Sequence, residues 1–132
     1  MPGTRPPRRG ITQREWSRLV HPAAGTTWLA VAPADPATTI ALTHLLKTRT
    51  PGTYEFAVMV EDAWQGQGIG SYLTHYALHT AAELPDCETV TTMYGASNRR
   101  ATAIVTSLNA ALPTPESGIL HVTLPLPARS RP

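Results

Sequence analysis

The segment Tyr54–Ala82, YEFAVMVEDAWQGQGIGSYLTHYALHTAA, predicts a strand, a glycine-rich turn and a helix. Its first part alternates large apolar side chains with smaller or polar ones, the period-two pattern of a strand. After the turn, apolar residues recur every three or four positions, as on one face of a helix. These positions are Ile69, Leu73, Tyr76, Ala77, Ala81 and Leu84. We expect the rest of the chain to be organised around this unit.

The turn contains Gly66, Gly68 and Gly70. Glycines permit a tight turn, remove side chains that would block a ligand, and leave backbone N–H groups pointing outward. At a helix N-terminus, unsatisfied amides and the helix dipole both favour an anion. The turn therefore predicts a site for a phosphate or pyrophosphate, although glycines that only solve a packing problem remain the simpler alternative.

Two common phosphate motifs do not fit this turn. A P-loop needs Lys and then Ser or Thr after its last glycine, whereas Gly70 is followed by Ser71 and Tyr72. The Rossmann motif needs a third glycine that is also absent. Residues 65–70, QGQGIG, instead match Gln/Arg-x-x-Gly-x-Gly/Ala. Preceded by a Val-x-Val strand, this motif resembles the coenzyme A pyrophosphate loop of the GNAT superfamily of N-acetyltransferases.

Length and composition indicate one globular domain of 132 residues, 42% of them hydrophobic. We expect a disordered basic arm at 1–10, a single domain at 11–127 and a disordered tail at 128–132. No apolar run is long enough to cross a membrane and the N-terminus lacks a signal-peptide core, so a cytoplasmic protein without membrane contact is expected. The single cysteine, Cys87, lies between two acidic residues, which indicates an inert thiol.

The net charge of +2 comes from the chain ends. Between residues 19 and 128 there are four basic and eight acidic residues, so the body is mildly acidic. An arginine arm contacting nucleic acid is a third hypothesis for function, but no basic helix with interleaved aromatic residues supports it.

The remaining pattern predicts a mixed, mostly antiparallel sheet flanked by helices, an α/β (α+β) fold. A helix is expected at 12–20 and a second, ending at Pro113 and Pro115, from Asn98 to Leu112. Pro125 should confine the last strand to an edge or a terminus. The strands are expected at 27–32, 38–47, 54–60, 88–94 and, for the last, 118–126.

This order resembles the GNAT fold from its second strand onward and covers residues 25–126. About 26 residues precede the first predicted strand, so the superfamily's first strand is expected to be missing and its substrate-side helices reduced to one. The acceptor groove would then be more open or completed by a second subunit in a homodimer. The run EFAVMVEDAWQGQGIGSYL is most similar to the GNAT domain of bacterial protein-lysine acetyltransferases.

The resemblance implies acetyl-CoA as cosubstrate and an amine as acceptor. It implies that Glu55 is the general base and that Asn98, in Asn-x-x-Ala, contacts the pantetheine arm. The strand segment Val58, Met59 and Val60 would bond pantetheine through its backbone. The implied pyrophosphate residues are Gln65, Gly66, Gln67, Gly68, Ile69, Gly70 and Ser71.

A base is also required on chemical grounds, because an amine such as lysine, with a pKa near 10.4, is protonated at neutral pH and must lose a proton before it attacks. Glu55 lies between Tyr54 and Phe56, where we expect partial desolvation. The alternative is that Glu55 only solvates the end of its strand. The sequence leaves protein lysine, a small amine and an antibiotic open as acceptors.

The chain departs from the family pattern in two places. Val105 occupies the position of a tyrosine that protonates the leaving thiolate in many members, and Asn109-Ala110 replaces a Gly-Phe. Tyr94 and Tyr76 are the nearest candidates for the acid, and the alternatives are that both tyrosines only pack and that solvent supplies the proton. The departures favour a second hypothesis, a degenerate domain that binds CoA as a sensor or recruiting module.

His75 and His79 are spaced like a zinc pair on the helix, but no third ligand is evident, so no metal is expected. His44 and His121 could reach the acceptor groove from neighbouring strands, but surface positions or satisfied hydrogen bonds are the preferred interpretation.

Overall fold

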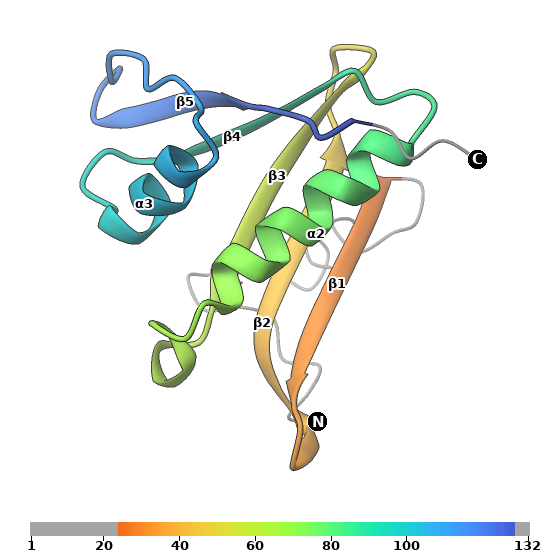
Figure 1. Cartoon of the computed structure of the whole chain (residues 1–132), viewed down its shortest axis with the longest axis vertical. Coiled ribbons are helices and arrows are strands. Elements are labelled where there is room, and N and C mark those ends of the chain that lie inside the picture. Colours follow the sequence, from red (N-terminus) through yellow and green to blue (C-terminus); the bar gives the residue numbers. More distant parts are fainter. Residues whose placement is uncertain (1–23, 129–132) are drawn as a thin grey trace.

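A computed structural model describes residues 24–128 as a sheet with helices packed on one face (Figure 1). The strands are β1 (Gly25–Ala32), β2 (Asp35–Lys47), β3 (Thr53–Val60), β4 (Thr89–Gly95) and β5 (Ile119–Leu124). The helices are the 3-10 turn η3 (Asp62–Trp64), α2 (Ile69–Glu83) and α3 (Arg99–Ser107). The predicted arm at 1–10, the predicted helix at 12–20 and residues 129–132 of the tail lie outside the described residues.

The five strands lie in the order β1-β2-β3-β4-β5. Only β3 and β4 are parallel, and the other three neighbouring pairs are antiparallel. The α2 crossover makes this single parallel pair possible. The prediction of a mixed, mostly antiparallel sheet is therefore confirmed, and so is the edge position of the strand that precedes Pro125.

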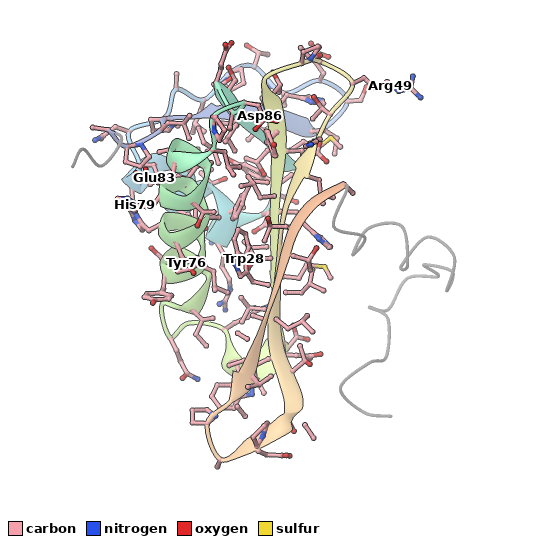
Figure 2. The ribbon with its side chains drawn as sticks, turned by 90° about the vertical axis from the view of Figure 1, so that its right-hand side faces the viewer. Trp28, Arg49, Tyr76, His79, Glu83 and Asp86 are labelled. Carbon is pink, nitrogen blue, oxygen red and sulfur yellow. The ribbon has the colours of Figure 1, made fainter. Side chains whose placement is uncertain are left out.

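The core lies between the sheet and the two α-helices, which cover the same face (Figures 1 and 2). Tyr54 and Phe56 of β3 are each 5% exposed, as the period-two pattern predicts. They belong to one cluster with Ala77 and Leu78 of α2 and Val105 of α3. Among the described helices, none is both long and apolar enough to span a membrane.

The predicted apolar face of α2 is partly wrong. Leu78 is 2% exposed and packs in the core, whereas Tyr76 is 50% exposed. The ring of Tyr76 meets the Trp28 ring of β1 edge-on, with centroids 5.6 Å apart. The buried stripe also includes Thr74, which tolerates burial because its hydroxyl donates to the Gly70 carbonyl at 2.6 Å.

Helix α3 ends at Ser107, earlier than the prolines predicted. Asn109 takes a left-handed conformation (φ 61°), and its N–H bonds the Thr106 carbonyl at 3.0 Å. The Ala110 N–H bonds the Val105 carbonyl at 3.3 Å. These two bonds are a Schellman motif, which ends a helix with a residue at positive φ. Asn109 thus serves the conformational role for which glycine is usually chosen, and the loss of Gly-Phe does not disrupt the end of the helix.

Candidate functional site

The site lies where β3 and β4 separate (Figure 1). These strands pair at only three positions, and the pairing ends at Glu55 with Thr91. The Thr92 hydroxyl then donates to the Phe56 carbonyl at 2.8 Å. Beyond it, Phe56–Val60 of β3 and Thr92–Gly95 of β4 run apart. We call this region the divergence.

Within the divergence, β3 presents unpaired backbone groups. The Glu61 N–H bonds the Ile40 carbonyl on β2 at 2.8 Å, so odd-numbered residues of β3 direct their backbone toward β2. By alternation, Val58 and Val60 direct theirs toward β4, where the ladder has already ended. The Val60 carbonyl accepts from the Gln65 side chain, so the groups left for a ligand are those of Val58 and the Val60 N–H. An extended ligand can therefore add to this edge as a strand would.

The turn after β3 is held by Gln65. Its side-chain Nε2 donates to the Val60 carbonyl at 3.0 Å and lies 3.2 Å from Asp62 Oδ1. Gly66 and Gly68 both have φ of 81°, a conformation that favours glycine. Gln65 therefore fixes the shape of the turn with its side chain, and exposed Gln67 lies between the two glycines.

The N-terminus of α2 is open. Its N-cap residue is Gly68, and no side chain caps it. The first helical bond runs from the Tyr72 N–H to the Gly68 carbonyl at 2.9 Å, which leaves the N–H groups of Ile69, Gly70 and Ser71 without a partner in the helix. A Cβ added to Gly68 would meet nothing within 4 Å. The described structure thus leaves room beside free amides at the positive end of the helix dipole.

Gly70 has a different role from the other two glycines. A Cβ here would lie 3.4 Å from Ile104 Cδ1 and 3.8 Å from Val60 Cγ2. A Cβ would thus be in ordinary contact with side chains of β3 and α3, so this glycine faces the packed interior near both elements. Gly70 does not have the positive φ that Gly66 and Gly68 use to shape the turn.

Arg100 of α3 also reaches this turn, which the sequence analysis did not anticipate. Its Nη1 lies 3.9 Å from the position that a Cβ on Gly66 would take. An arginine beside free amides strengthens a site for a phosphate, because its planar guanidinium can donate two hydrogen bonds to one anion. Its position directly after Asn98-Arg99 was the only available signal, and nothing local indicates which of the two arginines turns toward the loop.

Asn98 caps α3. Its side-chain Oδ1 accepts a hydrogen bond from the Ala101 N–H at 3.0 Å. The oxygen is therefore engaged within the protein, and the side-chain NH₂ is the group left to contact a ligand. The predicted role of Asn98 in binding pantetheine is compatible with this arrangement, because the NH₂ group can donate to a ligand while the oxygen keeps the cap.

Glu55 lies at the last paired position before the divergence. Its side chain is exposed on the sheet face opposite α2 and α3, whereas its neighbours Tyr54 and Phe56 are buried on the helix face. The expected desolvation by these neighbours is therefore absent in the described structure. The fold does, however, place the Glu55 carboxylate beside the point where the two strands separate.

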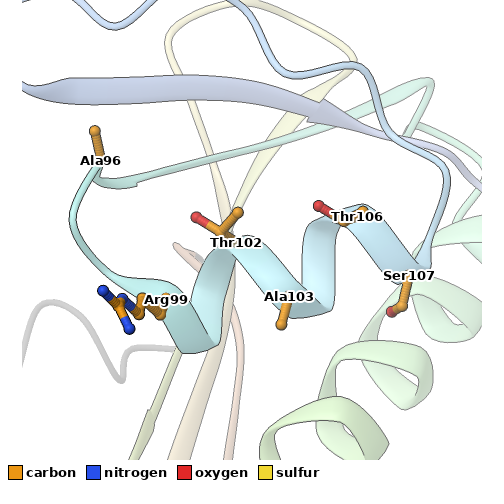
Figure 3. Close-up of a pocket in the computed structure, with 6 residues that line it drawn as sticks. All are labelled: Ala96, Arg99, Thr102, Ala103, Thr106 and Ser107. Carbon is orange, nitrogen blue, oxygen red and sulfur yellow. The ribbon is translucent and has the colours of Figure 1, made fainter.

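Arg99 points in a different direction from Arg100, into an open hollow of about 580 Å³ on the outer side of α3 (Figure 3). The hollow is lined by Ala96, Arg99, Thr102, Ala103, Thr106 and Ser107. Val105, at the family's tyrosine position, is 4% exposed and faces the core instead.

The histidines do not form a metal site among the described residues. His75 and His79 are exposed on α2, and His79 is seen on its outer side in Figure 2. His44 is buried on β2, with Nδ1 2.8 Å from the Thr27 hydroxyl, and burial lowers its pKa below the usual 6.5. His121 is exposed opposite Met93. The interpretation of His44 as a satisfied histidine is therefore supported.

A sequence profile of the Acetyltransferase (GNAT) family matches residues 2–107. Together with the divergence and the glycine turn, this match defines the class of protein. The chain belongs to the GNAT acetyltransferase family, whose members use acetyl-CoA and an amine acceptor.

Solved structures agree in fold. The GNAT domain of S. lividans PAT has a TM-score of 0.72 and 17% identity, covering 86% of this chain and 69% of that one. A protein assigned as a phosphinothricin N-acetyltransferase has a TM-score of 0.71 and 16% identity, covering 89% and 82%. A mutant spermidine N-acetyltransferase from Vibrio cholerae has a TM-score of 0.65 and 13% identity, covering 84% and 71%. No curated protein matches the chain by sequence.

Proposed function

We propose that this protein is an N-acyltransferase that moves an acetyl group from acetyl-CoA directly to an amine, with Glu55 as the general base. The observation that carries the proposal is the continuity of the free β3 edge with the uncapped N-terminus of α2. Pantetheine amides would bond the backbone of Val58 and Val60, and the pyrophosphate would accept from the amides at 69–71 and from Arg100.

Glu55 suits the role of base because of where it lies. The thioester would reach the narrow end of the divergence, and an amine arriving from the face opposite the helices would meet the carboxylate there. An exposed carboxylate can take the ammonium proton directly or through one water. The neutral amine then attacks the thioester carbonyl carbon.

The amine would arrive on the sheet face opposite α2 and α3. The described residues of this face favour a lysine on a protein over a polyamine. Besides Glu55, this face exposes the apolar Met59 (48%) on β3 and Met93 (54%) on β4, and His121 on β5 opposite Met93. A polyamine carries several ammonium groups and is best matched by several carboxylates. A single lysine flanked by apolar residues fits one carboxylate and two methionines. Protein-lysine acetylation also agrees with the sequence resemblance noted for residues 55–73.

One observation favours the second candidate, a CoA-binding module without transfer. Val105 is buried and apolar at the position where many members place their tyrosine acid. Such a module would bind acetyl-CoA through the same turn and release no thiol.

The test is acetyl-CoA binding by calorimetry, followed in the same sample by release of free thiol with lysine peptides, polyamines and other small amines. Binding with amine-dependent release supports the transferase. Binding without release from any amine supports the module, and no binding contradicts both. Glu55→Gln should lower turnover about 100-fold or more while leaving acetyl-CoA affinity nearly unchanged. Unchanged turnover would remove Glu55 from the mechanism.

A further inference from the structure

Tyr94 of β4 carries a buried hydroxyl that has no hydrogen-bond partner among residues 24–128. Its half-buried side chain packs against the core cluster on the helix face of the sheet, and its cross-strand neighbour is buried Leu120 of β5. Leaving a buried hydroxyl unpaired costs free energy, so such a group indicates a partner that the described residues do not supply.

Tyr94 lies on the segment of β4 that borders the divergence. Glu55 is opposite Thr91 at the last paired position, and Val58 and Tyr94 each lie three residues beyond it on their own strands. Between these levels, the bond from the Thr92 hydroxyl to the Phe56 carbonyl marks the narrow end. From Val60 to Phe56 the β3 edge runs about 13 Å, at about 3.3 Å per residue. An extended pantetheine arm that starts at the turn and follows this edge brings its sulfur toward the level of Tyr94 and Thr92.

The other tyrosines are unsuited to meet that sulfur. Tyr54 donates to both oxygens of Asp86 at 3.0 Å. Tyr72 is 69% exposed and Tyr76 is 50% exposed, both on α2. Of the chain's 4 tyrosines, Tyr94 is therefore the one whose hydroxyl is both buried and free to donate.

We propose that the Tyr94 hydroxyl donates a hydrogen bond to the cofactor sulfur and gives its proton to the departing CoA thiolate. The inference rests on the proposed function. When the amine nitrogen bonds the carbonyl carbon, the carbon–sulfur bond breaks and its electron pair leaves on sulfur. Sulfur takes the Tyr94 proton to give free CoA thiol. The amine nitrogen loses a proton to solvent as the amide forms. The tyrosinate takes one proton back from solvent.

The other charged and titratable side chains on the elements around Tyr94 lie at other places in the structure. On α3, Arg100 is at the Gly66 turn and Arg99 at the outer hollow. On α2, the exposed groups are Tyr72, His75, Tyr76, His79 and Glu83. On β5, His121 is exposed opposite Met93 and so on the face away from the helices, as is Glu55 of β3. A change in sulfur protonation on removing the Tyr94 hydroxyl can therefore be assigned to that hydroxyl.

The test compares wild type with Tyr94→Phe, using CoA and acetyl-CoA in calorimetry at pH 7 and pH 9. A donor to the thiolate lowers the pKa of the bound thiol, so wild type should gain affinity for CoA at pH 9. Acetyl-CoA has no free thiol and reports any other effect of pH. Tyr94→Phe should reduce the CoA gain about fivefold or more. Its acetyl-CoA affinity should change much less, because a neutral thioester sulfur is a weak acceptor, and its thiol release with an active amine should be about tenfold or more slower.

The control is Thr43→Val, which removes the other buried hydroxyl without a partner. Thr43 lies on β2 opposite Val58, where the ladder is continuous, and should affect neither readout. Tyr94→Phe should also unfold at the same temperature as wild type or higher, since it removes an unpaired group.

Equal CoA behaviour of wild type and Tyr94→Phe would overturn the role of Tyr94 and leave the transferase standing. A marked loss of thermal stability would also overturn it, because the hydroxyl would then have a structural partner. If wild type binds CoA but releases no thiol with any amine, the transferase proposal fails, and the pH dependence still decides the sulfur contact. If wild type binds neither ligand, both fail.

Discussion

Two helices begin beside the divergence, and they begin differently. Helix α3 is closed by its own N-cap, Asn98, whose side-chain oxygen bonds the Ala101 N–H at 3.0 Å. Helix α2 begins at Gly68 with no side-chain cap. Both have the positive end of a helix dipole, but the cap of α3 occupies the Ala101 N–H, whereas α2 leaves the N–H groups of Ile69, Gly70 and Ser71 without a partner in the helix. The difference teaches that a capping side chain, as much as the dipole, decides which helix start binds a ligand.

The largest expected effect on acetyl-CoA binding comes from blocking the uncapped N-terminus of α2. Gly68→Glu places a side chain and a negative charge where the anion would bind, and should weaken acetyl-CoA binding about 100-fold or more in calorimetry. The matched control is Gly118→Glu. Gly118 also has positive φ (77°) and nothing within 4 Å of an added Cβ, but it lies in the turn before β5. The control should bear a similar conformational cost and bind normally. Weakened binding by both variants would mean that strain, and not the anion site, explains the loss.

The two arginines after Asn98 sharpen the comparison, because only one reaches the start of α2. Arg100→Ala should weaken acetyl-CoA binding about tenfold or more, as expected for the loss of a hydrogen bond to a charged group. The difference from wild type should shrink at high salt if the guanidinium is exposed beside the phosphate.

Arg99→Ala removes an equal charge at the outer hollow and serves as the matched control. Similar losses from both variants would show that general positive charge on α3 attracts the cofactor, and the specific contact of Arg100 with the turn would be wrong.

The N-cap of α3, Asn98, can be tested for a second role in binding acetyl-CoA. Asn98→Ala removes the cap and should lower the free energy of unfolding by about 1 kcal/mol in urea titrations. Asn98→Asp keeps an oxygen acceptor for the Ala101 N–H and loses only the NH₂ group. Its stability should match wild type while its acetyl-CoA affinity falls. Normal affinity in Asn98→Asp would limit Asn98 to capping.

Local pattern predicted much of this site, because the strand, turn and helix at 54–82 depend on neighbouring residues. It failed where the outcome depends on three-dimensional packing. Tyr76 and Leu78 are both compatible with an apolar stripe on α2, and only the approach of β1 and β3 decides which is buried. The separation of β3 from β4 leaves no sequence signal, since side-chain alternation does not set the length of pairing.

The end of α3 and the role of Arg100 show the same limit. The prolines at 113 and 115 are strong helix stops, but Asn109 ends the helix first through a backbone conformation that asparagine adopts more readily than most residues. Arg100 meets Gly66 across 34 positions of sequence, so its neighbour Arg99 looked equivalent until the fold was known. The predicted roles of Glu55 and Asn98 as functional residues remain predictions.

The smallest expected effect lies at the far end of α2, away from both helix starts. The Tyr54 hydroxyl is buried and bonds Asp86, and desolvation with the nearby carboxylate raises its pKa from 10.0 to about 12. Between these values the unfolded chain loses the proton first and binds fewer protons than the folded one. The free energy of unfolding should therefore fall as pH rises from 10.0 toward 12, and this contribution is fully present below pH 10.0.

Tyr54→Phe should lower stability by about 1 kcal/mol at pH 8 and flatten this alkaline decline in urea titrations. Tyr72→Phe, at an exposed tyrosine on the same helix–sheet unit, should leave both the stability and the slope unchanged. Because Tyr54 is buried on the joined part of β3, its variant should also keep normal acetyl-CoA affinity below pH 9. A loss of affinity there would mean that the divergence and the paired end of the sheet are coupled, and that the contrast between the two helix starts does not by itself account for binding.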